Sequence, residues 1–370
     1  MTNCLGLYIH IPFCERKCNY CSFYSFKPEN SQREKYVQSL CAEIKKWGVR
    51  NARPINSIYL GGGTPSLLSQ NELEDIFSAI RENFEITKDC EITCEVNPNS
   101  ADLFLEYAAK MGVNRISVGI QSANDEELKV LGRLHTFSQA RATIDKAKSL
   151  GISNISVDIM LGLPDSSLKG LENSVKSILE LKPKHISAYI LKVEEGTNFE
   201  KIEGTLNLPN DDEVSEQYIF LCDLLRKNGY NHYEISNFAL DGFESRHNNK
   251  YWLCQEYIGI GPSAHSFYEG NRFYYSNSLE DFIKGKEPVF DEVGGDTEEF
   301  IMLRLRLSRG LEFNELEKTF GKVLTEDFYK TARLLEKNNL VTLDSNRISL
   351  TDKGMLVSNS IITKLVGCLK

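Results

Sequence analysis

The stretch YIHIPFCERKCNYCSF (residues 8–23) decides how the rest of the chain is read, because it places three thiols within eight residues directly after an apolar strand pattern. Cys14, Cys18 and Cys21 follow CxxxCxxC spacing, which can bring three sulfurs to one side of a tight loop. Thiolates are soft ligands that select zinc, Cu(I) or iron–sulfur clusters. The sequence therefore predicts a metal centre at this loop.

Spacing alone leaves three interpretations of the loop open. A structural zinc site needs a fourth ligand, and neither His10, which lies in the strand, nor Phe23 supplies one by spacing. A cubane cluster can be held by three cysteines if its fourth iron is left to a non-protein ligand, a variation on four-thiolate ligation. The third interpretation is a loop whose thiols are only buried or joined in a disulfide. Ligand chemistry favours the cluster.

Length and charge bound the possible functions. The 370 residues suffice for a large barrel core and a smaller appended domain. The net charge of −9 argues against a broad nucleic-acid surface. No apolar run approaches the ~20 residues that span a bilayer, although a peripheral membrane contact stays open. The first residues lack a charged and apolar leader pattern, so we expect a cytoplasmic protein whose ten cysteines bind metal or pack.

Short β-branched runs alternate with helical patterns from residue 6 to about residue 190, which predicts a parallel sheet of βα units. Ser69 and Glu72 form a capping-box pattern for the second helix. About six such units make an α/β fold, an incomplete (βα)6 TIM-like barrel, whose chemistry gathers at the C-terminal ends of the strands. The expected strands are 6–11, 57–60, 91–96, 115–120, 154–160 and 185–190.

Polar residues gather at those predicted strand ends. The second strand runs into GGGTPS (residues 61–66), and Glu95, Gln121 and Asp158 lie at the ends of the next three strands. A carboxylate in an apolar strand is rarely buried without a partner. An internal salt bridge or cap explains each residue taken alone. Together at one rim they predict the lining for a polar ligand of some size.

The pattern YIHIPFCxxxCxxC resembles the signature of radical S-adenosylmethionine (SAM) proteins. Within that superfamily it resembles the branch that contains oxygen-independent coproporphyrinogen III oxidases and HemW-type heme chaperones. The likeness runs over nearly the whole chain. It implies that Cys14, Cys18 and Cys21 ligate a 4Fe–4S cluster whose open iron chelates SAM. Such a cluster, when reduced, passes an electron to the sulfonium of SAM, and the protein supplies the placement.

The resemblance also assigns a SAM pocket position by position. In the family, a GGGTP motif contacts the SAM amino group, two aromatic residues flank the ligand, and the acid of an ExNP motif approaches the ribose. A glutamine, an arginine and an aspartate complete the pocket. The matching positions are Gly62, Gly63, Thr64, Tyr8, Tyr20, Glu95, Gln121, Arg133 and Asp158. Arg133 has a physical case as well, because a guanidinium can pair with the SAM carboxylate in bidentate fashion. Its alternative is a surface charge at a helix end.

A second informative block, residues 233–265, is rich in His, Asn, Ser and aromatic residues. Its HNNKYW segment (residues 247–252) resembles the HNxxYW motif typical of HemW-type heme chaperones, which implies that His247 contacts heme. Imidazole can ligate iron, and aromatic faces can cover a flat ring system. Without the resemblance, the block is better explained as a loop that closes the open side of the barrel.

Two departures from the oxidases favour the chaperones. Oxidases generally carry a further cysteine where this chain has Phe23, and a long extension where only seven residues precede Tyr8. We therefore expect a heme chaperone that binds a 4Fe–4S cluster, SAM and heme, and that delivers heme to proteins such as respiratory enzymes. Its other partner is an electron donor. The alternatives are an oxygen-independent coproporphyrinogen III oxidase in porphyrin biosynthesis and a radical enzyme acting on another substrate.

Three domains are predicted: a partial barrel at 1–235, a connecting segment at 236–296 that carries the HNxxYW motif, and a C-terminal domain at 297–370. Helical patterns followed by a probable hairpin at 340–343 and 347–350 predict a winged-helix-like α+β domain. Many winged helices bind DNA. Acidic and basic residues nearly balance in this segment, so we do not expect a nucleic-acid partner.

Overall fold

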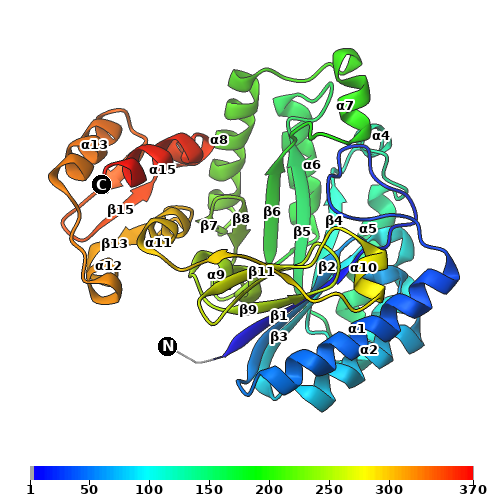
Figure 1. Ribbon diagram of the computed structural model, residues 1–370. Helices are drawn as coiled ribbons and strands as arrows, with labels where there is room; N and C mark the ends of the chain where they lie inside the picture. The colour runs from blue at the N-terminus through cyan, green and yellow to red at the C-terminus, as the bar shows by residue number, and fades with distance from the viewer. Residues whose placement is uncertain (1–3, 370) are drawn as a thin grey trace.

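A curved 12-stranded sheet with helices on its outside lies beside a smaller domain built on a 3-stranded sheet, in a computed structural model that describes residues 4–369 (Figure 1). Six parallel strands follow one another in chain order across the large sheet. The structure confirms the incomplete (βα)6 barrel. The six strands are β1 (Leu5–Ile11), β2 (Ile55–Gly62), β3 (Ile86–Val96), β4 (Arg115–Gln121), β5 (Asn154–Leu161) and β6 (His185–Ile190).

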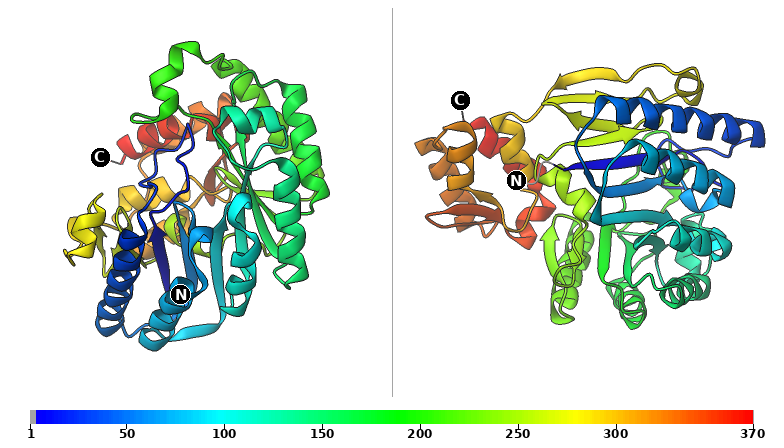
Figure 2. Two further views of the ribbon diagram at one scale, coloured as in Figure 1. Left: turned by 90° about the vertical axis from the view of Figure 1, so that its right-hand side faces the viewer. Right: turned by 90° about the horizontal axis from the view of Figure 1, so that it is seen from below.

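Helices cover the convex side of this sheet, as Figure 2 shows from two further directions. They are α1 (Asn30–Arg50), α2 (Gln70–Asn83), α3 (Asp102–Lys110), α4 (Asp125–Val130), α5 (Phe137–Ser149), α6 (Leu168–Glu180) and α8 (Asp211–Lys227). In contrast, α7 (Asn198–Ile202) lies beyond the strand ends, beside the cysteine loop. The predicted capping box begins α2: the Glu72 amide donates to Ser69 Oγ, and the Glu72 carboxylate accepts from the Ser69 amide at 2.7 Å. Such a cap contributes about 1 kcal/mol.

Side chains alternate along the strands between the helix-covered face and the concave face of the barrel. In β1 and β2, Ile9, Ile58 and Leu60 are fully buried on the helix side, and each contributes about 2 kcal/mol of hydrophobic free energy. Tyr8 and Tyr59 pair across the two strands on the other face and are partly exposed. The concave face is therefore an accessible, largely polar surface, which leaves room for a ligand.

The segment expected to connect two domains instead extends the barrel sheet at both edges. On one edge, β8 (Asn237–Ala239) pairs with β6 and with β7 (Asn231–Glu234). On the other edge, β9 (Tyr257–Ile260) runs parallel to β1, and three antiparallel strands follow: β10 (His265–Tyr268), β11 (Asn271–Tyr274) and β12 (Val289–Val293). Pairing with distant strands determines these edge strands, so local alternation did not reveal them in the sequence. The helices of this segment are α9 (Arg246–Trp252) and α10 (Leu279–Ile283).

The C-terminal domain has the expected mixed α+β composition. The predicted hairpin is confirmed as β14 (Val341–Leu343) and β15 (Arg347–Leu350), and β13 (Leu311–Glu312) pairs with β15. No helix among residues 4–369 combines the length and the apolar character needed to cross a membrane. The helices of this domain are α11 (Thr297–Arg304), α12 (Phe313–Phe320), α13 (Glu326–Lys337), α14 (Asp352–Leu356) and α15 (Ser358–Gly367).

Candidate functional site

The cysteine loop leaves the C-terminal end of β1 and is tied to segments far along the chain. The Asn19 amide donates to the Leu131 carbonyl at 3.0 Å, and the Phe199 amide donates to the Asn19 carbonyl at 2.8 Å. Arg16 donates through Nη2 to the Gly132 carbonyl at 2.8 Å. These bonds hold the loop over the ends of the barrel strands. The loop thus occupies the rim where the sequence predicted the chemistry.

Cys14, Cys18 and Cys21 are free, partly exposed thiols. Burial raises the pKa of Cys21, and the nearby Cys18 and Cys14 sulfurs raise it further, so the three thiols face a common space. Among the described residues, this trio does not gather within the 4.8 Å that marks a single-ion site. Three neighbouring thiols that are not all within 4.8 Å of one another suit a cluster of several irons better than one zinc ion.

The GGGTP motif packs directly against the backbone that leads into the cysteine loop. A β-carbon on Gly62, whose φ is +107°, would lie 2.5 Å from the His10 ring, and one on Gly63 would lie 2.6 Å from the Phe13 carbonyl oxygen. Glycine is therefore required at both positions. The close approach brings the Thr64 hydroxyl to 3.4 Å from Cys14 Sγ, to which it donates. Two predicted parts of the site are thus in contact.

Arg133 joins the cysteine loop to the strand ends. Its Nη1 donates to Cys18 Sγ at 3.5 Å, and its Nη2 donates to the Gly119 carbonyl at 2.7 Å and to Asn97 Oδ1 at 3.2 Å. Its Nε is buried with no hydrogen-bond partner in the described part of the chain. The guanidinium is therefore fixed beside the Cys18 sulfur, where its positive charge favours a carboxylate ligand.

Two carboxylates face the concave space behind the thiols. Glu95 accepts from the Tyr59 hydroxyl at 2.9 Å and from the Gly62 amide at 3.0 Å. Burial, followed by the Asp158 charge, raises the pKa of Glu95 to about 7. Asp158 accepts from Ser117 Oγ at 3.2 Å, and burial raises the pKa of its carboxyl as well. A pair of buried carboxylates with raised pKa values suits a ligand that brings hydroxyl or amine donors.

Tyr20 and Gln121 complete this group. Burial raises the pKa of Tyr20 while the Arg133 charge lowers it, and Asp158 lies close enough to contribute, so the phenol lies between the loop and the strand ends. Gln121 ends β4 with a φ of +71°, and its Nε2 would lie 3.0 Å from a β-carbon on Gly119. The structure thus gathers the cysteines, Thr64, Arg133, Glu95, Gln121, Asp158 and Tyr20 at one end of the barrel.

The side chain of Tyr8 lies deeper on the same face. Its hydroxyl is 3.0 Å from His10 Nδ1, and its ring centroid is 6.1 Å from that of Tyr59. Tyr8 is therefore connected to the carboxylate pair through Tyr59, which donates to Glu95. It forms the floor of the space rather than its rim.

His247 lies beneath that floor, at the opposite end of the barrel from the cysteines. Its ring is 0 % exposed, with Nδ1 at 3.0 Å from Ser57 Oγ and Nε2 at 2.9 Å from the Tyr251 hydroxyl. Burial lowers its pKa to about 3. Because both ring nitrogens are engaged, this geometry disfavours the expectation that His247 contacts heme iron. The HNxxYW motif instead closes the bottom of the barrel.

Sequence reasoning missed three contributors to the site. Tyr59 and Asn97 hold Glu95 and Arg133, and both sit beside motifs that the sequence had singled out. Arg115 is 2 % exposed, and its charge lowers the pKa values of Glu95 and Asp158. An arginine at the start of a strand ordinarily indicates a solvent-exposed strand end. For this reason the sequence did not identify Arg115 as a buried part of the site. The alternation of side chains along β2 places Tyr59 on the concave face, and this was the sequence signal that could have found it.

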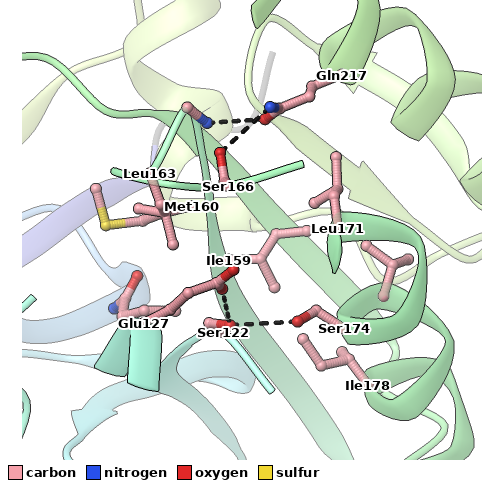
Figure 3. A pocket seen from close by; sticks show the side chains of 13 residues that line it. Ser122, Glu127, Ile159, Met160, Leu163, Ser166, Leu171, Ser174, Ile178 and Gln217 are labelled. Carbon is pink, nitrogen blue, oxygen red and sulfur yellow. Dashed lines mark hydrogen bonds between the residues drawn. The ribbon is translucent and has the colours of Figure 1, made fainter. Parts of the chain in front are cut away.

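Two other places in the fold offer polar groups but do not compete with this site. A cavity of about 10 Å³ between β5 and α6 has room for about one water molecule (Figure 3). Cys222, His232 and Asp352 bring three potential metal ligands within 4.8 Å of one another near the C-terminal domain. Arg226 already pairs with Asp352 at 2.8 Å, so a cation there meets a positive charge.

Comparison with known proteins agrees with this geometry. The Radical SAM superfamily matches residues 8–178, and the HemN C-terminal domain matches residues 296–357. The chain is 35% identical to the heme chaperone HemW of Lactococcus lactis subsp. lactis, covering 97% of this chain and 96% of that protein. It is 33% identical to the heme chaperone HemW of Bacillus subtilis, covering 97% and 98%.

Among solved structures, the coproporphyrinogen III oxidase HemN of Escherichia coli superposes with a TM-score of 0.85, covering 98% of this chain and 90% of that chain. At 22% identity this likeness establishes the shared fold alone. The HemW relatives are more similar in sequence and match along nearly their whole length. The chain therefore belongs to the HemW family of radical SAM proteins.

Proposed function

We propose that this protein is a cytoplasmic heme chaperone that binds heme and delivers it to heme-requiring proteins such as respiratory enzymes. The observation that carries the proposal is the similarity along nearly the whole chain to proteins named heme chaperone HemW. Phe23 supports it as well: it stands 63 % exposed on the cysteine loop, where an oxidase generally carries a further cysteine. An electron donor and a peripheral membrane contact remain part of the proposal.

Membership of the radical SAM superfamily implies an iron–sulfur cluster and SAM. We assign the cluster, as 4Fe–4S, to Cys14, Cys18 and Cys21, because the three thiols are free and face a common space. When bound, the cluster supplies the electron that cleaves the sulfonium of SAM. Thr64 and Arg133 flank the sulfurs and hold the polar end of SAM against them.

The chain's own residues orient SAM through complementary charge and hydrogen bonding. The Arg133 guanidinium, which lies beside Cys18, would supply the positive charge for the SAM carboxylate. Glu95 and Asp158 would accept from ribose hydroxyls, beside the donors that they already have within the chain. Gly62 and Gly63 keep side chains out of the space beside the amino group, and Tyr20 covers the adenine.

The second candidate function is coproporphyrinogen III oxidation, which the HemN-like fold favours. One experiment separates the two. The reconstituted protein is incubated anaerobically with SAM, a reductant and coproporphyrinogen III, while a parallel sample is titrated with heme. A chaperone retains heme stoichiometrically and forms no protoporphyrinogen, and this is the outcome we expect. Protoporphyrinogen formed catalytically would overturn the proposal in favour of the oxidase. Deoxyadenosine release without either porphyrin result would favour a radical enzyme with another substrate.

A further inference from the structure

One cluster of potential metal ligands lies outside the site described above, where the C-terminal domain meets the barrel. Cys222 of α8, His232 of β7 and Asp352 of α14 each bring one ligand atom to within 4.8 Å of the other two. No other trio of His, Cys, Asp or Glu in residues 4–369 does so. Two of these ligands belong to the barrel and one to the C-terminal domain. Figure 1 shows α8 and β7 at the barrel edge next to that domain.

The hydrogen bonds around His232 leave one of its ring nitrogens facing an oxygen atom. The Tyr218 hydroxyl has one proton, which it donates to the Ile235 carbonyl at 3.1 Å, a closer acceptor than Met355 Sδ at 3.8 Å. The hydroxyl oxygen therefore accepts from His232 Nε2, which lies 3.4 Å away. In a neutral imidazole only one nitrogen carries a proton. His232 Nδ1 thus presents a lone pair to Asp352 Oδ1 at 3.2 Å.

Two acceptors that face each other at this distance need a positive charge, either on the ring or between the two atoms. Asp352 is ionised at neutral pH, because the His232 hydrogen bond and, after it, Arg226 lower its pKa to about 2 despite burial. A second proton on the imidazole would satisfy the pair, but it leaves Cys222 without a part in the contact. A metal ion would use all three ligand atoms.

The donor set and its spacing suit zinc. Zinc binds sulfur, imidazole nitrogen and carboxylate oxygen at about 2.0–2.3 Å, so two ligand atoms of one tetrahedral site lie about 3.3–3.8 Å apart. His232 Nδ1 and Asp352 Oδ1 already have nearly this spacing, at 3.2 Å. Cys222 Sγ has to come closer by little more than about 1 Å. Tyr218 accepts from the other ring nitrogen, as the partners of metal-bound histidines usually do.

An open cleft leads to the cluster. His232 and Asp352 line this cleft, whose volume is about 450 Å³, and the fully buried Cys222 lies behind them. A metal ion can enter from the cleft, and water can complete its coordination, as in zinc sites with three protein ligands.

The charges near the cluster balance a divalent ion. Arg226 repels a cation here, but it donates through Nη1 to Asp223 Oδ1 at 2.9 Å and through Nη2 to Asp352 Oδ2 at 2.8 Å. With Asp223 balancing Arg226, the Cys222 thiolate and the Asp352 carboxylate remain to balance Zn²⁺. Burial raises the pKa of Cys222 to about 12, so the thiol keeps its proton until a metal ion replaces it.

We propose that Cys222, His232 and Asp352 bind one zinc ion that fastens the C-terminal domain to the barrel. The two parts already share backbone hydrogen bonds near this point, such as the one from the Ile235 amide to the Arg306 carbonyl at 3.0 Å. The zinc ion adds a link between side chains of both parts. This site is independent of heme, SAM and the iron–sulfur cluster, so it does not depend on the proposed function.

The test uses the full chain with Cys14, Cys18 and Cys21 replaced by alanine, because those thiols would also bind zinc. Zinc is titrated anaerobically against a chromophoric chelator, and the absorption of bound Co²⁺ reports thiolate ligation. We expect one site per chain with a thiolate band. Adding Cys222→Ser should abolish the band and weaken zinc binding at least about tenfold. Cys90 is another buried free thiol whose pKa burial raises to about 12, and Cys90→Ser should keep both properties.

Thermal unfolding and pH give two further readouts. Zinc should raise the midpoint of unfolding of the parent chain and of Cys90→Ser, and leave Cys222→Ser unchanged. Zinc affinity should rise between about pH 6 and pH 8, because Cys222 releases its proton on binding. His232→Gln keeps the size of the side chain, and we expect it to weaken zinc binding at least about tenfold as well.

Several results would overturn the site. Zinc affinity within about twofold of the parent chain in Cys222→Ser would leave only an ion pair between His232 and Asp352. Co²⁺ bound without a thiolate band would exclude Cys222 as a ligand. An equal loss of binding in Cys90→Ser would attribute the effect to a disturbed core. If Cys222→Ser does not fold, His232→Gln decides, and unchanged zinc affinity in that variant would overturn the site.

Discussion

The two ends of the barrel contain different kinds of polar residues. At the C-terminal end, Arg133 keeps a buried Nε without a partner in the described chain, and Glu95 carries a pKa near 7 because burial outweighs its two hydrogen bonds. At the N-terminal end, both nitrogens of His247 are engaged, and Lys250 donates to the Cys4 carbonyl at 3.1 Å. Both ends keep a buried polar atom without a partner in the described residues, Arg133 Nε at the first and Trp252 Nε1 at the second. The first end also gathers two carboxylates with raised pKa values beside three free thiols.

This difference shows how to distinguish a binding motif from a structural one. Buried polar atoms cost free energy unless they are hydrogen-bonded, about 1–3 kcal/mol each. A ligand that brings a hydrogen-bond partner to such an atom recovers that cost. In the HNxxYW motif, His247 bonds to Tyr251 and to Ser57 of β2, yet Trp252 Nε1 has no partner in the described residues. Neither polarity nor a missing partner alone therefore marks a ligand site, whereas the free thiols and buried charged groups at the C-terminal end do.

The comparison predicts its largest effect at the cysteines. A Cys14→Ala, Cys18→Ala, Cys21→Ala variant should bind almost no iron or sulfide after anaerobic reconstitution, since no other trio of thiols faces a common space in the described residues. Its thermal unfolding without iron should stay close to that of the native chain, because the three side chains are partly exposed. Iron and sulfide analysis with calorimetry measures both.

A matched control exists for this variant. Cys41, Cys254 and Cys368 are also free and partly exposed, and their triple alanine variant should load iron as the native chain does. Equal loading in the two triple variants would show that the CxxxCxxC loop does not hold the cluster.

At the other end, removing the His247 ring should damage stability and spare the cofactors. His247→Ala leaves the Ser57 and Tyr251 hydroxyls without their partner and opens a buried cavity, which should lower the free energy of unfolding by about 2–4 kcal/mol. Cluster content per folded molecule should be unchanged. Chemical denaturation of the iron-free chain measures the loss, and His265→Ala serves as the exposed control with a change within about 0.5 kcal/mol. Unchanged stability in His247→Ala would contradict a structural role for the His247 ring.

The sequence predicted the barrel well because its strands are long enough to show their period. All six expected parallel strands exist, and only their ends differ, as with β3, which begins at Ile86 rather than at residue 91. The edge strands β9 to β12 escaped detection although the expected strands β14 and β15 are no longer than they are. Pairing with β1 and with one another determines these strands, and local pattern does not encode such distant contacts.

Within the site, spacing and resemblance brought the right residues to the rim but did not reveal their orientation. Glycine at residue 62 and Arg133 were expected to touch SAM; the structure adds that the glycine also admits the His10 ring and that the arginine bonds a thiol. For His247 the motif predicted a ligand, whereas the side chain turns into the barrel floor. The direction in which a helix presents its histidine depends on packing, and the motif alone does not contain that information.

The smallest expected effect tests whether the carboxylate pair is strained without a ligand. Burial raises the pKa of Glu95 from 4.5 to about 7, so between these values the native chain holds a proton that the unfolded chain has released. Stability of the SAM-free protein should therefore fall as pH rises through this window and level off above pH 7. Glu95→Gln removes this contribution. The free energy of unfolding of the variant, relative to that of the native chain, should therefore be about 1–3 kcal/mol higher at pH 8 than at pH 5. Glu234, whose pKa burial also raises to about 7, keeps a residual slope in both proteins. The difference between them therefore reports Glu95 together with its interaction with Asp158. Urea denaturation at the two pH values measures it, with Glu82→Gln on the exposed side of α2 as control.

A Glu95→Gln profile parallel to the native one would mean that Tyr59 and Gly62 already satisfy the carboxylate, and the incomplete rim would then rest on Arg133 and the thiols alone.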